Sequence, residues 1–124
     1  MKILLVEDSH ATASLEIEAV RHIFTHTVDI IRALDGQAAI ERFEQHEINL
    51  VLLDWHLPKI EGIDVLKEIR KTNTTVPIIM ITCETALESI NAAMKAGVTD
   101  YVIKPFNIKT LTEKIRKNFT WQEM

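Results

Sequence analysis

Three acidic side chains, one hydroxyl and one lysine each follow a short apolar run, and together they could bind a cation and a phosphoryl group. The set comprises Glu7, Asp8, Asp54, Thr82 and Lys104. If these side chains converge, the carboxylates outnumber the ammonium, and closely packed like charges destabilise one another unless a cation joins them. Hard oxygen ligands favour Mg²⁺. A carboxylate can also act as a nucleophile that forms an aspartyl phosphate, so the set predicts phosphoryl transfer to an aspartate.

The elements that must position these residues are predicted by five short apolar runs. The runs are rich in Ile and Val, too short for buried helices and free of polar alternation, which is typical of strands covered on both faces. They span residues 3–6, 28–31, 50–53, 78–81 and 101–103. Stretches with helical spacing of apolar residues lie between and after them. We therefore expect an α/β fold, a doubly wound five-stranded parallel sheet with five helices.

Capping residues predict the helix boundaries, and the spacing of apolar residues predicts the buried helix faces. Asp35 and Asn107 stand where helix N-caps are expected, and Gly97 stands where a left-handed C-cap is expected. The stripe predicted to face the core in the first helix consists of Ala11, Leu15, Ala19 and Ile23.

The predicted sheet also places the site. In open α/β sheets, ligands bind outside the carboxyl ends of the strands, where the strand order reverses. The residues that follow the first, third, fourth and fifth runs are therefore expected to share one crevice. The second run ends in Ala33 and Leu34 and is expected to contribute nothing to it.

Composition limits the function further. The chain has 124 residues, 47% of them hydrophobic and 26% charged, which is typical of one globular domain spanning residues 1–124. Its net charge of −4 argues against nucleic acid as a partner. No apolar run approaches the ~20 residues of a membrane span. The single cysteine, Cys83, forms no internal disulfide, so we expect a cytoplasmic protein.

The order and spacing of several motifs carry a family resemblance. They are Glu7-Asp8, Leu52-Leu53-Asp54 with Pro58 and Gly62 after it, Thr82, Ala96-Gly97, Asp100-Tyr101 and Lys104-Pro105-Phe106. Over about residues 2–119 the chain resembles the receiver domain of bacterial two-component response regulators, in particular the stand-alone chemotaxis-protein (CheY-like) type. The resemblance implies one response regulatory domain with the flavodoxin-like strand order 2-1-3-4-5.

The same resemblance implies the roles of the acidic residues. Asp54 is expected to be the phosphoacceptor, which takes a phosphoryl group from a phosphohistidine on a sensor histidine kinase or a histidine phosphotransfer protein. Asp8, Asp54 and the backbone carbonyl of His56 are expected to hold Mg²⁺, and Glu7 to act on it through water.

Further roles are implied for residues around the acids. Lys104 and Thr82 are expected to bind phosphoryl oxygens, with a cis bond between Lys104 and Pro105. Thr82 and Tyr101 are expected to form the switch. When Thr82 is drawn to the phosphoryl group, it leaves space into which the Tyr101 ring turns.

Three positions are expected to tune the lifetime of the phosphoryl group, namely His56, Cys83 and Glu84. His56 and Glu84 stand two residues beyond Asp54 and Thr82, at variable positions of the family. Cys83 stands where a small alanine is more usual. We expect it to narrow access to the phosphoryl group and to pack as a small buried hydrophobe rather than to react.

The implied output is contact with another protein. The chain is expected to act as a phosphoacceptor signalling protein that assists its own phosphorylation and dephosphorylation, not as an enzyme with a separate substrate. The expected docking face is the fourth helix, fifth strand and fifth helix, including Lys95, Tyr101, Lys104 and Lys109. Either chemotaxis or a phosphorelay fits this pattern, with a monomer or a weak phosphorylation-dependent dimer.

Three alternatives remain at this stage. A receiver-like adaptor that acts without phosphorylation would not need the full acidic set or Lys104. A flavodoxin-type FMN carrier needs backbone donors in a hydroxyl- and glycine-rich loop after the first strand, whereas this chain offers Glu7-Asp8-Ser9, which repels a phosphate that has no metal ion beside it. A metal-dependent phosphatase with an aspartate nucleophile needs a second acid two residues on, where this chain has His56.

Overall fold

The computed structural model describes residues 1–24 and 28–119, and strands and helices alternate within these ranges. The strands are β1 (Lys2–Val6), β2 (Asp29–Ala33), β3 (Leu50–Leu53), β4 (Ile78–Thr82) and β5 (Asp100–Ile103). The helices are α1 (His10–Ile23), α2 (Gly36–Gln45), α3 (Gly62–Arg70), α4 (Leu87–Ala96) and α5 (Ile108–Lys117). All neighbouring strands are parallel and lie in the order β2-β1-β3-β4-β5, which confirms the predicted fold.

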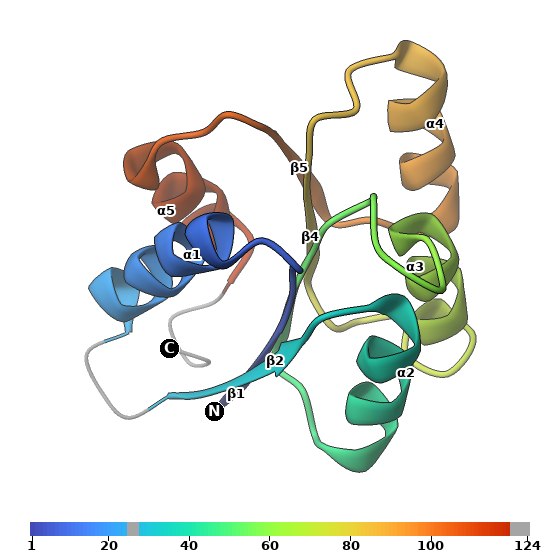
Figure 1. The fold of residues 1–124 in the computed structure, drawn as a ribbon, viewed down its shortest axis with the longest axis horizontal. Coiled ribbons are helices and arrows are strands. Elements are labelled where there is room, and N and C mark those ends of the chain that lie inside the picture. Colours follow the sequence, from blue (N-terminus) through green and yellow to red (C-terminus); the bar gives the residue numbers. More distant parts are fainter. Residues whose placement is uncertain (25–27, 120–124) are drawn as a thin grey trace.

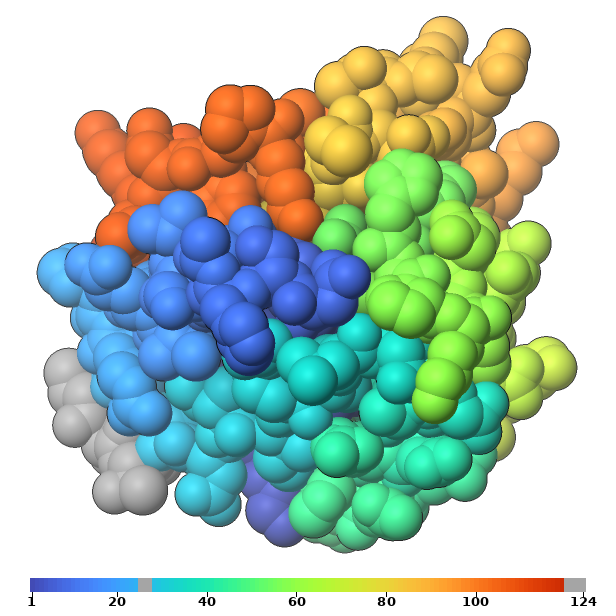
Figure 2. All heavy atoms as spheres, viewed as in Figure 1, coloured from blue at the N-terminus to red at the C-terminus, as the bar shows by residue number. Residues whose placement is uncertain are grey.

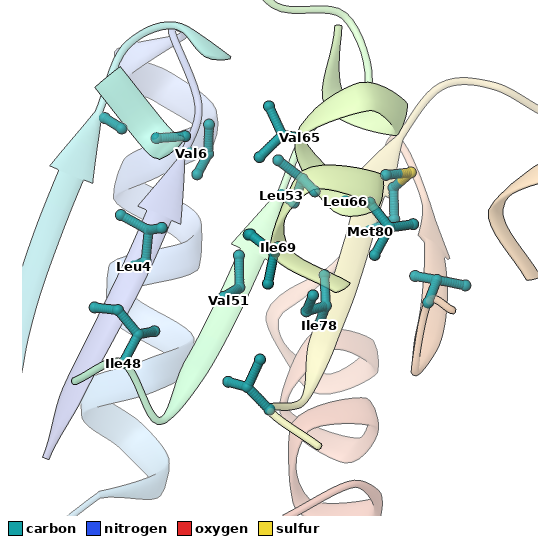
Figure 3. Close-up of a cluster of buried hydrophobic side chains, with 14 of the residues drawn as sticks. Leu4, Val6, Ile48, Val51, Leu53, Val65, Leu66, Ile69, Ile78 and Met80 are labelled. Carbon is teal, nitrogen blue, oxygen red and sulfur yellow. The ribbon is translucent and has the colours of Figure 1, made fainter. Parts of the chain in front are cut away.

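Helices cover both faces of the sheet. In Figure 1, α1 and α5 lie on one side of the strands, and α2, α3 and α4 lie on the other. Each side has its own apolar core. Figure 3 shows the core beneath α3, where Leu66 and Ile69 pack toward Val51 and Leu53 of β3. Every residue of β3 is buried, so the strand that precedes Asp54 is held from both faces.

The predicted helix ends are confirmed by their capping contacts. Asp35 Oδ1 accepts a hydrogen bond from the Ala38 N–H at 2.8 Å, and Asn107 Oδ1 accepts one from the Thr110 N–H at 2.8 Å. Gly97 ends α4 with a φ of 97°, a left-handed conformation that glycine adopts without the steric cost of a Cβ.

The predicted apolar stripe of α1 is wrong at its N-terminal half. Ala11 and Leu15 are exposed, and the buried face instead carries Ala13, Glu16, Ala19, Val20 and Ile23. A step of four residues overshoots a full helical turn by about 40°, so repeated i, i+4 steps drift around the helix. Spacings of three and four residues together keep the buried stripe on one face.

β2 is shifted along the chain relative to the predicted run. It begins at Asp29 and continues through Arg32 to Ala33, which pairs with Val6. The charged Arg32 interrupts the apolar run without ending the strand. None of the helices in the described ranges has the length and apolar character that crossing a bilayer requires.

Candidate functional site

Three acids meet at the carboxyl ends of β1 and β3. Glu7 and Asp8 follow β1, Asp54 follows β3, and one carboxylate oxygen of each lies within 4.8 Å of the others. Glu7 and Asp54 are buried, with 1% and 6% of their surface exposed, whereas Asp8 is exposed. In Figure 2, the blue start of α1, the green loop after β3 and the yellow and orange segments after β4 and β5 adjoin one another. The predicted acidic cluster therefore exists and is open to solvent at Asp8.

Lys104 is the cation of this cluster. Its Nζ lies 2.6 Å from Glu7 Oε1 and 3.0 Å from Asp54 Oδ2. Burial opposes the charge on the ammonium, but the hydrogen bonds that it donates to the two carboxylates outweigh burial and raise the pKa of Lys104. Burial also opposes the charge on Glu7 and raises the pKa of that carboxyl group, although the hydrogen bond from Lys104 lowers it. Lys104 is therefore charged at neutral pH and presents N–H donors beside Asp54. The peptide bond between Lys104 and Pro105 is cis, as predicted.

The donor set fits a hard divalent cation. Mg²⁺ takes oxygen ligands and is usually held by one or two carboxylates together with waters or phosphate oxygens. Both oxygens of Glu7 are engaged, Oε1 by Lys104 and Oε2 by the Ser9 N–H at 3.2 Å. Asp8 offers an exposed carboxylate next to Asp54. The arrangement suits Asp8 and Asp54 as direct ligands and Glu7 as a more distant one.

The turn after β3 fixes the orientation of Asp54. The Trp55 N–H donates a hydrogen bond to Asp54 Oδ1 at 2.7 Å, which leaves Oδ2 directed toward Lys104. The Gly62 N–H donates to the Trp55 carbonyl at 2.7 Å. A Cβ at position 62 would overlap the carbonyl oxygen of Asp54, so only glycine allows the chain to return this closely behind Asp54.

Thr82 and Tyr101 both contact the backbone of Glu84. The Tyr101 hydroxyl donates a hydrogen bond to the Glu84 carbonyl at 3.0 Å, and Thr82 Oγ1 accepts one from the Glu84 N–H at 3.4 Å. Burial, with smaller contributions from the negative charges of Glu84 and Cys83, raises the pKa of the Tyr101 phenol to about 12. The hydroxyl therefore keeps its proton, and Glu84 lies between the two residues predicted to form the switch.

The side chain of Glu84 bridges two loops. His56 Nε2 lies 3.0 Å from Glu84 Oε2, and Ser89 Oγ donates a hydrogen bond to Glu84 Oε1 at 2.9 Å. The hydrogen bond with His56 lowers the pKa of Glu84 most, and the hydrogen bond from Ser89 lowers it as well. The other ring nitrogen of His56 lies 3.7 Å from Glu61. The two predicted lifetime positions thus contact each other directly across the mouth of the site.

Comparison with known proteins agrees with this geometry. Residues 3–116 match the family model described as the response regulator receiver domain. The chain belongs to the response regulator receiver family. This membership confirms the predicted family and the coarse function, which is that of a phosphoacceptor domain in two-component signalling.

Individual relatives of this receiver are chemotaxis proteins. The chain is 37% identical to chemotaxis protein CheY-3 of Vibrio cholerae over 122 residues, covering 96% of this chain and 92% of the relative. It is 34% identical to chemotaxis protein CheY of Pseudomonas aeruginosa, covering 96% of each chain. Among solved structures, the Mn²⁺-bound form of response regulator Rcp1 superposes with a TM-score of 0.81 at 30% identity, covering 98% of this chain and 94% of that one.

Cys83 of the receiver does not pack as predicted. The thiol is exposed rather than buried, because β4 and its cover on both faces end at Thr82 and Cys83 already belongs to the loop that follows. Cys83 lines a hollow of about 370 Å³ beside Lys104, together with residues of α1 and of the segment after β5. These further lining residues are Thr12, Leu15, Pro105 and Phe106.

One side chain of the predicted docking face, that of Lys104, is not available on the surface, and the face itself stays a prediction. Lys104 points into the acidic cluster instead of outward, because the two carboxylates hold its ammonium. The most exposed large apolar side chains in this part of the receiver are Leu87 and Met94 of α4, which are 72% and 58% exposed, and Ile103 at the end of β5 is 37% exposed. The face formed by α4 and β5 therefore presents apolar side chains to solvent as well as lysines.

Two polar residues near the site were not predicted. Arg32, on the strand expected to contribute nothing, donates a hydrogen bond from Nη2 to the Glu7 carbonyl at 2.7 Å. Glu16 is completely buried in the face of α1 that packs on the sheet. The spacing of Glu16 from Ala13, Val20 and Ile23 was the available signal, since it places all four side chains on one side of a helix.

Proposed function

We propose that this receiver accepts a phosphoryl group on Asp54 from a phosphohistidine, in a Mg²⁺-dependent reaction, and signals through phosphorylation-dependent contact with another protein. The observation that carries the proposal is the position of Lys104, whose ammonium touches both Asp54 and Glu7 at the edge of a three-carboxylate cluster. A structural ion pair alone would not require the second and third carboxylates.

The chemistry follows from the charges around Asp54. A carboxylate oxygen of Asp54 attacks the phosphorus atom, the P–N bond to the donor histidine breaks, and its electron pair remains on the imidazole, which is protonated from solvent. Lys104 donates hydrogen bonds to the phosphoryl oxygens, and Thr82 offers a hydroxyl at the adjacent strand end. Asp8, Asp54 and the carbonyl of His56 would hold Mg²⁺, which supplies positive charge for the ~1.5 to 2 negative charges that the phosphoryl group adds.

Thr82, Glu84 and Tyr101 are proposed to transmit the phosphorylation of Asp54 to the docking face. The backbone of Glu84 links Thr82 to Tyr101, and Tyr101 belongs to β5 of the proposed docking face. The partners are a sensor histidine kinase or a histidine phosphotransfer protein on the donor side. On the output side the partner is a protein that contacts α4, β5 and α5. We place the protein in the cytoplasm as a monomer or a weak phosphorylation-dependent dimer, in chemotaxis or a phosphorelay.

Intact-mass spectrometry tests the proposed acceptor. The receiver is incubated with acetyl phosphate and Mg²⁺, and wild type is compared with Asp54→Asn and with Asp64→Asn, which changes an exposed acid of α3. We expect one added phosphoryl group in wild type and Asp64→Asn and none in Asp54→Asn. Equal labelling of all three proteins would contradict Asp54 as acceptor.

A further inference from the structure

Glu16 is a buried carboxyl group that the proposed reaction does not use. Its exposed fraction is 0%, and neither carboxylate oxygen has a hydrogen-bond partner among the described residues. Its neighbours on the buried face of α1 are the apolar Ala13, Ala19, Val20 and Ile23. Burying an ionised carboxylate without a partner costs so much free energy that such a group normally takes up a proton instead. The burial and the missing partners therefore favour the neutral, protonated form of Glu16.

The charges that act on Glu16 are those of the acidic cluster. Burial is the largest cause that raises the pKa of Glu16 well above its ordinary 4.5. Glu7 on the β1 side and Asp54 on the β3 side raise it further, whereas Lys104 and Arg32 lower it. On α5, which packs against α1, the buried residues are Leu111, Thr112 and Ile115, so no charged side chain of α5 is buried there.

Arg32 connects this buried region with the acidic pair. It pairs with Leu5 of β1, and strand alternation places both side chains on the sheet face that α1 and α5 cover. The Nη2 of Arg32 donates to the Glu7 carbonyl at 2.7 Å, while its Nε is buried and has no partner in residues 1–24 and 28–119. The unpartnered Nε of Arg32 and the two unpartnered oxygens of Glu16 thus lie on the same side of the sheet.

We propose that Glu16 is a proton-releasing partner of the acidic cluster: it is neutral in the resting receiver and ionises when a divalent cation binds at Glu7, Asp8 and Asp54. The proposal rests on the proposed function, because it assumes that the cluster takes Mg²⁺. The only bond that breaks is the O–H bond of the carboxyl group, and the proton goes to solvent. The added positive charge favours the carboxylate, and the free N–H of Arg32 offers it a donor.

A reciprocal effect follows by thermodynamic linkage. If Mg²⁺ promotes the ionisation of Glu16, then ionised Glu16 strengthens Mg²⁺ binding by the same factor. The affinity for Mg²⁺ should therefore rise as the pH increases above 4.5, beyond the rise that the carboxylates of the cluster provide. The receiver would then load metal less well in an acidified cell.

Isothermal calorimetry in two buffers of different ionisation enthalpy counts the protons released per Mg²⁺ bound. Three proteins are compared between about pH 5.5 and pH 8: wild type, Glu16→Gln and Glu18→Gln, which changes an exposed acid of the same helix. We expect wild type and Glu18→Gln to release more protons than Glu16→Gln. We also expect the affinity of these two proteins for Mg²⁺ to rise over this pH range by a factor about fivefold larger than that of Glu16→Gln. Equal proton release and parallel affinity profiles in all three would overturn the proposal.

The same experiment distinguishes the proposed cation site from the role of Glu16. Binding of Mg²⁺ without a difference at position 16 contradicts only the role of Glu16, whereas no binding by any protein contradicts the proposed cation site and the role of Glu16 together. If Glu16→Gln does not fold, the carboxyl carbon of Glu16 is followed by NMR in wild type. We expect a midpoint above 4.5 that moves down when Mg²⁺ is added, and a midpoint that Mg²⁺ leaves unchanged would overturn the proposal.

Discussion

His56 Nε2 lies 3.0 Å from Glu84 Oε2, and this contact joins the loop after β3 to the loop after β4. The same glutamate accepts a hydrogen bond from Ser89 near the start of α4 and, through its carbonyl, another from Tyr101 of β5. His56, two positions beyond Asp54, is therefore linked through Glu84 to two elements of the proposed docking face, to α4 by the Glu84 side chain and to β5 by the Glu84 carbonyl. We therefore expect the lifetime of the phosphoryl group and its output to depend on this shared contact.

The first prediction concerns this contact and the rate of dephosphorylation. Removing either partner opens the mouth of the site to water, so His56→Ala and Glu84→Ala should each speed the loss of phosphate from the labelled receiver. Because the two side chains form one bridge, the rate of the double variant should differ from the product of the single effects by about twofold or more. Phosphate release after removal of the donor measures all four rates.

Glu61→Ala is the matched control for that cycle. Glu61 faces the other ring nitrogen of His56, at 3.7 Å, and belongs to the same loop rather than the opposite one. Because Glu61 does not bridge the two loops, Glu61→Ala alone should change the dephosphorylation rate less than Glu84→Ala does. Purely multiplicative rates in the His56–Glu84 cycle would contradict the bridge.

The second prediction concerns the hydroxyl of Tyr101, which is the single tyrosine of the sequence. Burial raises its pKa to about 12 from an ordinary 10, so the stability contributed by the protonated phenol is present below pH 10 and is lost as the pH rises through about 12. An ultraviolet absorbance titration should give a midpoint about two units above that of the same chain in denaturant. A midpoint near 10 in the folded protein would place the hydroxyl in water and break its link to Glu84.

The third prediction concerns stability and Glu16. Because the folded state raises the pKa of Glu16 above 4.5, the stability that the protonated form provides is present below pH 4.5 and is lost as the pH rises through the folded value. Glu16→Leu removes an unsatisfied buried carboxyl and should raise the free energy of unfolding near neutral pH by about 1–3 kcal/mol.

Denaturant unfolding at several pH values checks this change against Glu18→Leu. Glu18 is exposed on the same helix, so its substitution should change the free energy of unfolding by no more than ~0.5 kcal/mol. The difference in the free energy of unfolding between wild type and Glu16→Leu should widen as the pH increases. A destabilised Glu16→Leu protein, or a difference that does not vary with pH, would contradict a neutral Glu16 without partners.

The fourth prediction concerns Cys83, which lines the hollow beside Lys104. Cys83→Ala removes one sulfur atom from the side of the site and should speed dephosphorylation by widening the path for water. Cys83→Ser keeps nearly the same volume and should leave the rate close to that of wild type. Equal rates for Cys83→Ala and wild type would show that the exposed thiol does not restrict access.

The place of the site was predictable because apolar runs mark the strands and the reactive residues stand directly after them. Asp54 and Lys104 are 50 residues apart in the chain, yet both follow strands whose carboxyl ends share one edge of the sheet. Parallel topology alone brings such residues together. The prediction therefore needed only strand positions, not side-chain conformations.

The features that escaped prediction depend on packing that residue type does not encode. Glu16 was missed because a glutamate is expected in solvent, and its burial becomes evident only when the core face of α1 is known. Arg32 ended an apolar run, and nothing in the pattern indicates that its guanidinium reaches the carbonyl of Glu7. The bridge between His56 and Glu84 depends on the rotamers of two half-exposed side chains on different loops.

Chemical mapping of the phosphorylated residue tests the central proposal most directly. Borohydride reduces an aspartyl phosphate to homoserine, so a receiver treated with acetyl phosphate and Mg²⁺ is reduced, digested and sequenced by mass spectrometry. We predict homoserine at position 54 alone, dependent on Mg²⁺ and greatly diminished in Lys104→Ala, which lacks the ammonium beside Asp54. Homoserine at another acid, or none under conditions that label a known receiver, would contradict Asp54 as the phosphoacceptor.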